Sequence, residues 1–132
     1  MTDSDKSTYM RSFNSHFIDF LKDVITIFPE NIDIKNGLTS MELVKRLNPS
    51  IVIKIWHSKV YVPYQSVIDE GNLTFFFEKN YFEDLDKVNN AVDIMKIIDK
   101  LREPVKLMNE VNKQHTMKYI QNLSKLSKMY HN

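Results

Sequence analysis

The chain has 132 residues, of which 42% are hydrophobic and 27% charged, and its formal net charge at pH 7 is +1. These values are typical of one globular domain that can bury a core without crosslinks. The absence of cysteine excludes disulfide scaffolds, thiolate metal sites and thiol catalysis. A polar, acidic N-terminus and the lack of any apolar run of about 18 residues predict a protein that is neither secreted nor membrane-spanning.

The first predicted element is a long amphipathic helix over residues 7–28, after a flexible end at residues 1–6. Apolar side chains recur in this segment at intervals of three and four residues, which places them on one face of a helix. Pro29 ends the helix, because a proline restricts the residue before it to extended geometry.

A short second helix is predicted over residues 40–47. Gly37 reads as a break in the chain, and Thr39 with Glu42 forms the pattern of a capping box. The apolar residues that follow this pattern fit one helical face.

Residues 50–64 allow two interpretations. Residues 51–56 and 60–63 are mostly β-branched or aromatic, as in the two strands of a hairpin. Against this, Asn48 and Pro49 form a typical helix start, and the linking residues lack the Asn-Gly or Asp-Gly of a tight hairpin turn. The start favours a helix, and the hairpin stays open as the alternative.

The second half of the chain predicts further helices. Residues 64–70 form a short helix that Gly71 ends, and a long amphipathic helix covers residues 88–101. Pro104 either kinks that helix or starts a new one. A last helix of about six or seven turns runs from residue 105 onward. Its expected apolar stripe consists of Met108, Val111, His115, Tyr119, Leu123, Leu126 and Tyr130.

Together these elements predict an all-α fold. We expect a compact bundle of five to six helices around an aromatic-rich core, forming a single domain over residues 7–130. The hairpin at residues 50–64 is the one alternative to a purely helical chain.

The sequence offers no pattern for catalysis or for a bound cofactor. Its four histidines lack the spacing of a helical zinc site: His16, His57, His115 and His131. Its acidic cluster lacks the pattern of a calcium loop and fits a solvated turn: Glu78, Glu83, Asp84 and Asp86. The two isolated glycines form no phosphate-binding loop. We therefore expect a protein that is not an enzyme and that holds no metal and no cofactor.

An aromatic segment is the first candidate for binding a protein partner. It consists of Phe75, Phe76, Phe77, Tyr81 and Phe82. These side chains either belong to the core or form an exposed patch, and aromatic residues dominate the energetics of protein interfaces.

The basic C-terminal segment is the second candidate. Residues 1–103 carry 13 Lys/Arg and 16 Asp/Glu, a net charge of −3, whereas residues 104–132 carry five lysines and one glutamate, a net charge of +4. The candidate binding residues are Lys113, Lys118, Lys125 and Lys128. A basic amphipathic helix can bind nucleic acid or an acidic protein, although lysines also solvate an ordinary helix face.

Four strings of residues carry a resemblance to a known group of proteins. They are Phe28-Pro29-Glu30-x-x-Asp33-Ile34, Asn48-Pro49, Phe75-Phe76-Phe77-x-Lys79-x-Tyr81, and the run from Lys118 to Ser127. The chain resembles, over about residues 13–130, short helical proteins of giant nucleocytoplasmic large DNA viruses. The resemblance implies a small helical viral protein in the virion or the host cytoplasm, and it carries no catalytic residues over to this chain.

The function expected from the sequence is therefore a non-enzymatic one. The first hypothesis is a structural or adaptor protein that binds a protein partner. The alternative is a nucleic-acid-binding protein without sequence preference, because the basic segment lacks arginine, the usual reader of bases.

Overall fold

The computed structural model describes the backbone of residues 2–78 and 89–132, and the side chains of residues 2–76 and 94–132. This part of the chain is 86% helical and contains no strand, which confirms the all-α fold. The elements are α1 (Asp3–Ile27), α2 (Ile32–Leu47), α3 (Ile51–Ile55), η1 (Trp56–Tyr61), α4 (Val62–Asp69), α5 (Thr74–Glu78), α6 (Asn89–Lys100), α7 (Arg102–Leu107) and α8 (Glu110–His131). Since α3, η1 and α4 are continuous and only Leu101 separates α6 from α7, the described part amounts to six helices.

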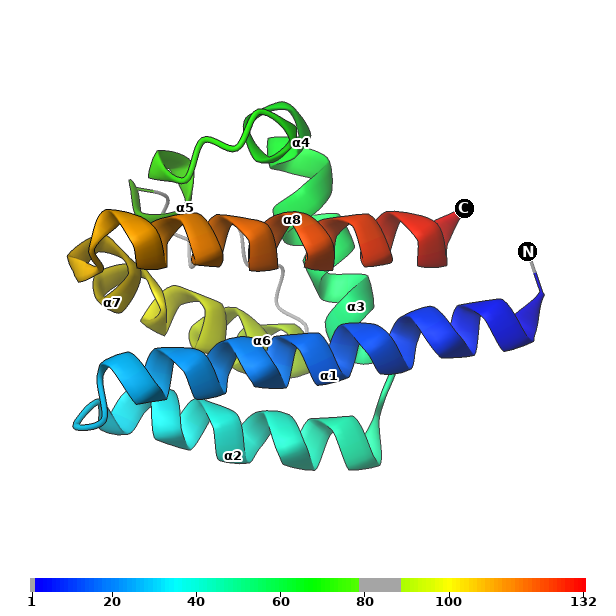
Figure 1. Cartoon of the computed structure of the whole chain (residues 1–132). Helices are drawn as coiled ribbons and strands as arrows, with labels where there is room; N and C mark the ends of the chain where they lie inside the picture. The colour runs from blue at the N-terminus through cyan, green and yellow to red at the C-terminus, as the bar shows by residue number, and fades with distance from the viewer. Residues whose placement is uncertain (1, 79–88) are drawn as a thin grey trace.

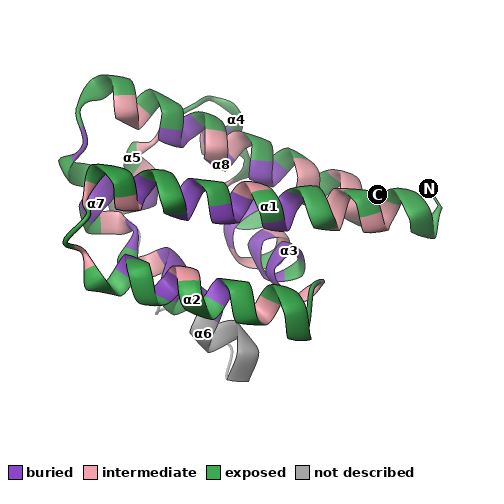
Figure 2. Cartoon of the chain, turned by 60° about the horizontal axis from the view of Figure 1, so that its bottom comes forward, coloured by how far each residue is buried: buried purple, intermediate pink, exposed green. Residues whose placement is uncertain are grey.

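The first and last helices pack side by side and run in opposite directions, and α2 lies along the other side of α1 (Figure 1). Buried and exposed positions alternate along α1 and α2, as expected for helices with one face in the core (Figure 2). The centre of the core is aromatic. The ring of Trp56 lies edge-on to Phe13 and Phe17, with centroids 6.1 and 6.0 Å away.

Helix α1 begins earlier than the sequence pattern suggested. The Thr2 side chain accepts a hydrogen bond from the backbone N–H of Asp5, whose carboxylate accepts one from the backbone N–H of Thr2. This capping box satisfies two backbone donors at the helix start, so α1 includes residues 3–6, which we expected in a flexible end.

Helix α2 is twice as long as the predicted helix at 40–47, and Gly37 does not break it. The helix starts at Ile32 because the Asn31 side chain accepts the backbone N–H of Ile34. Gly37 instead lies in the interior of α2, where a Cβ atom would be 3.4 Å from Ile97 of α6. Thr39 does not cap a helix, because its hydroxyl donates to the carbonyl of Lys35 within α2.

Residues 51–69 form one kinked helix, so the hairpin alternative at 50–64 is not what the structure shows. The kink follows from Pro63, which has no N–H to donate to the preceding turn. The backbone widens there into the π-helical segment η1, and the N–H of Val62 donates to the carbonyl of His57, five residues back. Tyr64 has non-helical angles (φ −122°, ψ 24°) immediately after the proline. Gly71 ends this helix with a positive φ of 78°, as predicted.

The last helix starts later than predicted, and five of the seven residues of its predicted apolar stripe lie in the core or pack against it. Met108 is extended and the Asn109 side chain caps α8, so the helix begins at Glu110 and not at residue 105. Two members of the predicted apolar stripe, Val111 and His115, are exposed. The buried residues of α8 are Thr116, Met117, Ile120, Leu123, Ser124 and Ser127.

Three of these buried residues are small and carry a hydroxyl group: Thr116, Ser124 and Ser127. Their size lets α8 approach the core closely, and the hydroxyl of Ser124 satisfies a polar group of the core. The indole Nε1–H of Trp56 donates to the hydroxyl of Ser124 at 2.9 Å, and both residues are buried. Among the described helices, none combines the length and the hydropathy that a bilayer span needs.

Candidate interaction recess between the first and last helices

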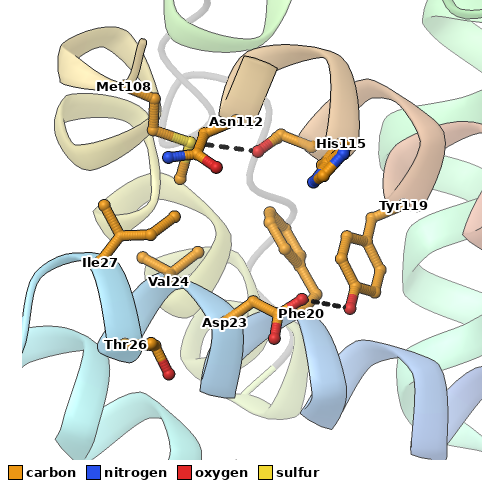
Figure 3. A pocket seen from close by; sticks show the side chains of 10 residues that line it. Phe20, Asp23, Val24, Thr26, Ile27, Met108, Asn112, His115 and Tyr119 are labelled. Carbon is orange, nitrogen blue, oxygen red and sulfur yellow. Dashed lines mark hydrogen bonds between the residues drawn. The ribbon is translucent and has the colours of Figure 1, made fainter.

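A recess of about 180 Å³ opens between the end of α1 and the first turns of α8 (Figure 3). Phe20 and Val24 from α1 and Met108 from the link before α8 form its apolar floor. Phe20 and Val24 lie one helical turn apart, on the face of α1 that packs into the core.

The rim of the recess is polar, apart from Ile27. Asp23 and Thr26 of α1 form one side, and Asn112 and His115 of α8 form the other. The local sequence explains the opening. Helix α1 ends at Ile27, just before Pro29, and the cap at Asn109 turns the chain into α8 opposite that end.

Tyr119 closes one side of the recess and connects the two helices. Its hydroxyl donates a hydrogen bond to the carboxylate of Asp23 at 2.5 Å. Its ring stacks on Phe20 with centroids 5.1 Å apart and lies 4.6 Å from the ring of His16. Burial, the bond to Asp23 and the negative charges of Asp23 and Asp19 raise the pKa of Tyr119 to about 12. The phenol therefore stays protonated at neutral pH and donates to Asp23.

His16 lies beyond Tyr119, in a shallower cleft that Ser12 and Lys125 also line. Burial lowers the pKa of His16, and the charges of Asp19 and Asp23 partly oppose that shift. Its Nε2 atom is buried and has no hydrogen-bond partner among the described residues. A neutral imidazole in this position contributes ring packing against Tyr119 and no charge.

Exposed apolar side chains adjoin the recess. Ile27 on its rim is 36% exposed. Leu107 and Val111 immediately precede two lining residues, Met108 and Asn112, and are 69% and 60% exposed. Large apolar side chains at this exposure beside a hollow are a feature of surfaces that bind partners.

The described residues do not gather the side chains of a metal site. No group of three histidine, aspartate or glutamate side chains there could hold a metal ion. His57 stacks on His131 with ring centroids 4.0 Å apart, and the His131 ring pairs with the carbonyl of Ser127. Residues 83, 84 and 86 of the acidic cluster lie outside the described part of the chain.

The predicted aromatic surface is described only in part. Phe76 is fully buried, so it touches no partner in this conformation. Phe75 is half-buried and stacks on Tyr64 with centroids 5.5 Å apart. The side chain of Phe77 and both Tyr81 and Phe82 lie outside the described residues. For those three, a role in partner binding stays a prediction.

The four candidate lysines do not all share one patch. Lys113 lies 3.9 Å from Glu110 and lines a polar hollow beside Gly71, together with Lys118. Lys125 lines the cleft that holds His16, on the side of α8 that faces α1. Lys128 is exposed near the end of α8.

Comparisons with known proteins identify no relative from which a function could be carried over. No family model matches the chain, and the searches of curated proteins and of solved structures found no significant match.

The recess was not predicted from the sequence, because the apolar spacing of residues 105–130 fits one continuous helix. The signal was present at Asn109, a residue type that commonly caps helices and that directly precedes an acid at Glu110. With that cap recognised, the extended Met108 and the start of α8 at Glu110 would have been expected, but their place beside the end of α1 is set by tertiary packing.

Proposed function

We propose that this chain is a non-enzymatic protein-interaction protein, acting as a structural component or an adaptor, and that its partner binds at the recess between α1 and α8. The recess carries this proposal. Its volume of about 180 Å³ is similar to that of a cavity of about 150 Å³ that accepts a benzene ring. One large apolar side chain of a partner therefore fits on the floor formed by Phe20, Val24 and Met108.

The polar groups at the rim favour binding over catalysis. The carboxylate of Asp23 accepts a hydrogen bond from Tyr119, and the pKa of that tyrosine is raised to about 12. An efficient general acid or base has a pKa near the working pH, and this phenol lies far above neutrality.

The test uses affinity capture of the tagged protein from its native cells, read by mass spectrometry with and without nuclease. Asn112→Phe places a bulky ring at the mouth of the recess. Ser15→Phe adds the same ring to an exposed position of α1 outside the recess and is the matched control.

We expect a nuclease-resistant protein that the wild-type chain and Ser15→Phe recover equally and that Asn112→Phe loses. A partner that Asn112→Phe retains would refute binding at the recess. Both variants should keep the helical circular dichroism of the wild type, which separates loss of binding from loss of fold.

The second candidate is a nucleic-acid-binding protein without sequence preference. Lys118 and Lys125 support it, because both are exposed, have no ion pair in the described part and lie seven residues apart on α8. That spacing corresponds to about 10 Å along the helix. Two neutralised phosphates would lower the affinity for duplex DNA about 12-fold between 50 and 200 mM salt.

Fluorescence anisotropy with a labelled 20-base-pair duplex measures that salt dependence. Replacing both lysines with glutamine should abolish it. Salt-independent binding, or no binding at low salt, would exclude this candidate.

The resemblance to small helical proteins of giant DNA viruses extends the first proposal to a component of the virion or of the infected cell. It rests on the residue strings quoted above. Detection of the chain in purified particles by proteomics would test it, and its absence from them would exclude a virion component.

A further inference from the structure

We propose that the recess selects a partner segment in which a large apolar side chain stands next to a lysine or an arginine. This inference rests on the proposed function, because it specifies the chemistry of the partner that the same recess binds. The apolar side chain occupies the floor, and the cationic group lies against Asp23 on the rim.

The charges around the recess are the first argument. None of its lining residues is a lysine or an arginine, and Asp23 is the single carboxylate among them. Asp19 lies one turn earlier on α1, and both acids are exposed. Neither acid forms an ion pair with another described residue. The one carboxylate among the lining residues therefore favours a cationic group of the partner over an anionic one at the rim.

The geometry of Asp23 is the second argument. One carboxylate oxygen accepts the hydroxyl of Tyr119, which holds the side chain at the rim. A carboxylate has about four acceptor sites, so Asp23 can also accept from an ammonium or a guanidinium group. The tyrosine thus positions the acid without neutralising it.

The closeness of acid and floor is the third argument. Val24 follows Asp23 directly in the sequence, and both line the recess. The apolar part of a ligand covers Val24 and Phe20. Its cationic group can reach Asp23 at the same time only if that group lies close to the apolar part. Neighbouring apolar and basic residues in one partner segment meet this requirement.

Three dipeptide probes test the inference. All three begin with N-acetyl-phenylalanine, and the second residue, as its amide, is arginine, glutamine or glutamate. Binding to the ¹⁵N-labelled full chain is followed by the amide shifts of Asn112, His115 and Thr116, which line the recess. We expect the arginine probe to bind about tenfold more tightly than the glutamate probe, with glutamine between them.

Asp23→Asn should make the affinities of the three probes equal, while the binding that comes from their shared phenylalanine remains. Glu42→Gln, which neutralises an exposed acid of α2 outside the recess, is the matched control and should leave the order unchanged. The dispersion of the amide spectrum shows for each variant whether the fold is intact.

The outcomes separate this inference from the proposed function. Equal binding of the three probes at the recess would overturn the charge preference and leave the recess as a binding site. Preference for glutamate would overturn it as well. Failure of every probe to shift the three amides at about 10 mM, a concentration at which fragments of this size bind preformed sites, would overturn the recess itself.

Discussion

Replacing Ser124 with alanine isolates the buried hydrogen bond that joins α8 to the core. The hydroxyl of Ser124 accepts the indole N–H of Trp56 at 2.9 Å, and the two side chains are 1% and 0% exposed. Because alanine lacks only the hydroxyl, the substitution leaves an unsatisfied buried donor and almost no cavity. The free energy of unfolding should fall by about 1–3 kcal/mol, the cost of a buried polar group without a partner.

Urea denaturation measures this change. The chain has a single tryptophan, so its fluorescence reports the surroundings of Trp56, while circular dichroism at 222 nm reports the helices. With a slope of about 2 kcal/mol per molar urea, the midpoint should fall by about 0.5–1.5 M. Ser127→Ala is the control. The Ser127 hydroxyl donates to the backbone carbonyl of Ser124, which leaves no orphaned donor when it is removed.

A double-mutant cycle completes the test. In a Trp56→Phe background no indole N–H remains, so Ser124→Ala should change the free energy of unfolding by less than about 0.5 kcal/mol. An unchanged midpoint for Ser124→Ala in the wild-type background would refute the role given to this bond.

Three further predictions concern the backbone and the histidine pair. Gly37→Ala should raise the free energy of unfolding by about 0.4–1 kcal/mol, because the added Cβ meets Ile97 at an ordinary 3.4 Å. Gly37→Leu should lower it by about 1–3 kcal/mol, because the larger side chain overpacks the contact. Thermal melts compare the two variants. Gly71→Ala should cost about 1–2 kcal/mol, because alanine is strained at a φ of 78°, and an unchanged melting temperature would contradict this. Burial and the neighbouring His131 lower the pKa of His57 below its ordinary value of 6.5. The unfolded chain therefore takes up the proton first, and stability falls as the pH drops through 6.5; His57→Asn should make the melting temperature less dependent on pH between 7 and 5.

The strongest periodic patterns of the sequence predicted the fold correctly. The apolar spacing of residues 7–28 marks α1, and Gly71 ends α4 as expected, because each is a local signal that no other signal opposes. Residues 50–64 were ambiguous, since β-branched residues fit both a strand and a buried helix face. The helix start at Asn48 and Pro49 favoured the helix, and the packing of α3 and η1 against α8 buries its β-branched residues.

The errors have two causes. The starts of α1, α2 and α8 are set by local caps at Thr2, Asn31 and Asn109 that the apolar periodicity did not reveal. The others come from tertiary packing that local patterns do not contain. Gly37 looked like a helix break, but it lies inside α2, where it faces Ile97 of α6. Ser124 and Ser127 are absent from the predicted apolar stripe, but both are buried, and Ser124 accepts the indole N–H of Trp56. The recess depends on the same kind of information, because its two walls are far apart in the sequence.

The pairing of the first and last helices determines when the domain can form. Tyr119 bonds to Asp23 across 96 residues and Trp56 to Ser124 across 68, so contacts that close the core join residues far apart in the sequence. The loops between them must close before these contacts form, which costs chain entropy and slows folding. Until the ribosome has released residues 110–131, the phenylalanines of α1 have no α8 to cover them, and the nascent chain is exposed to aggregation and to chaperones.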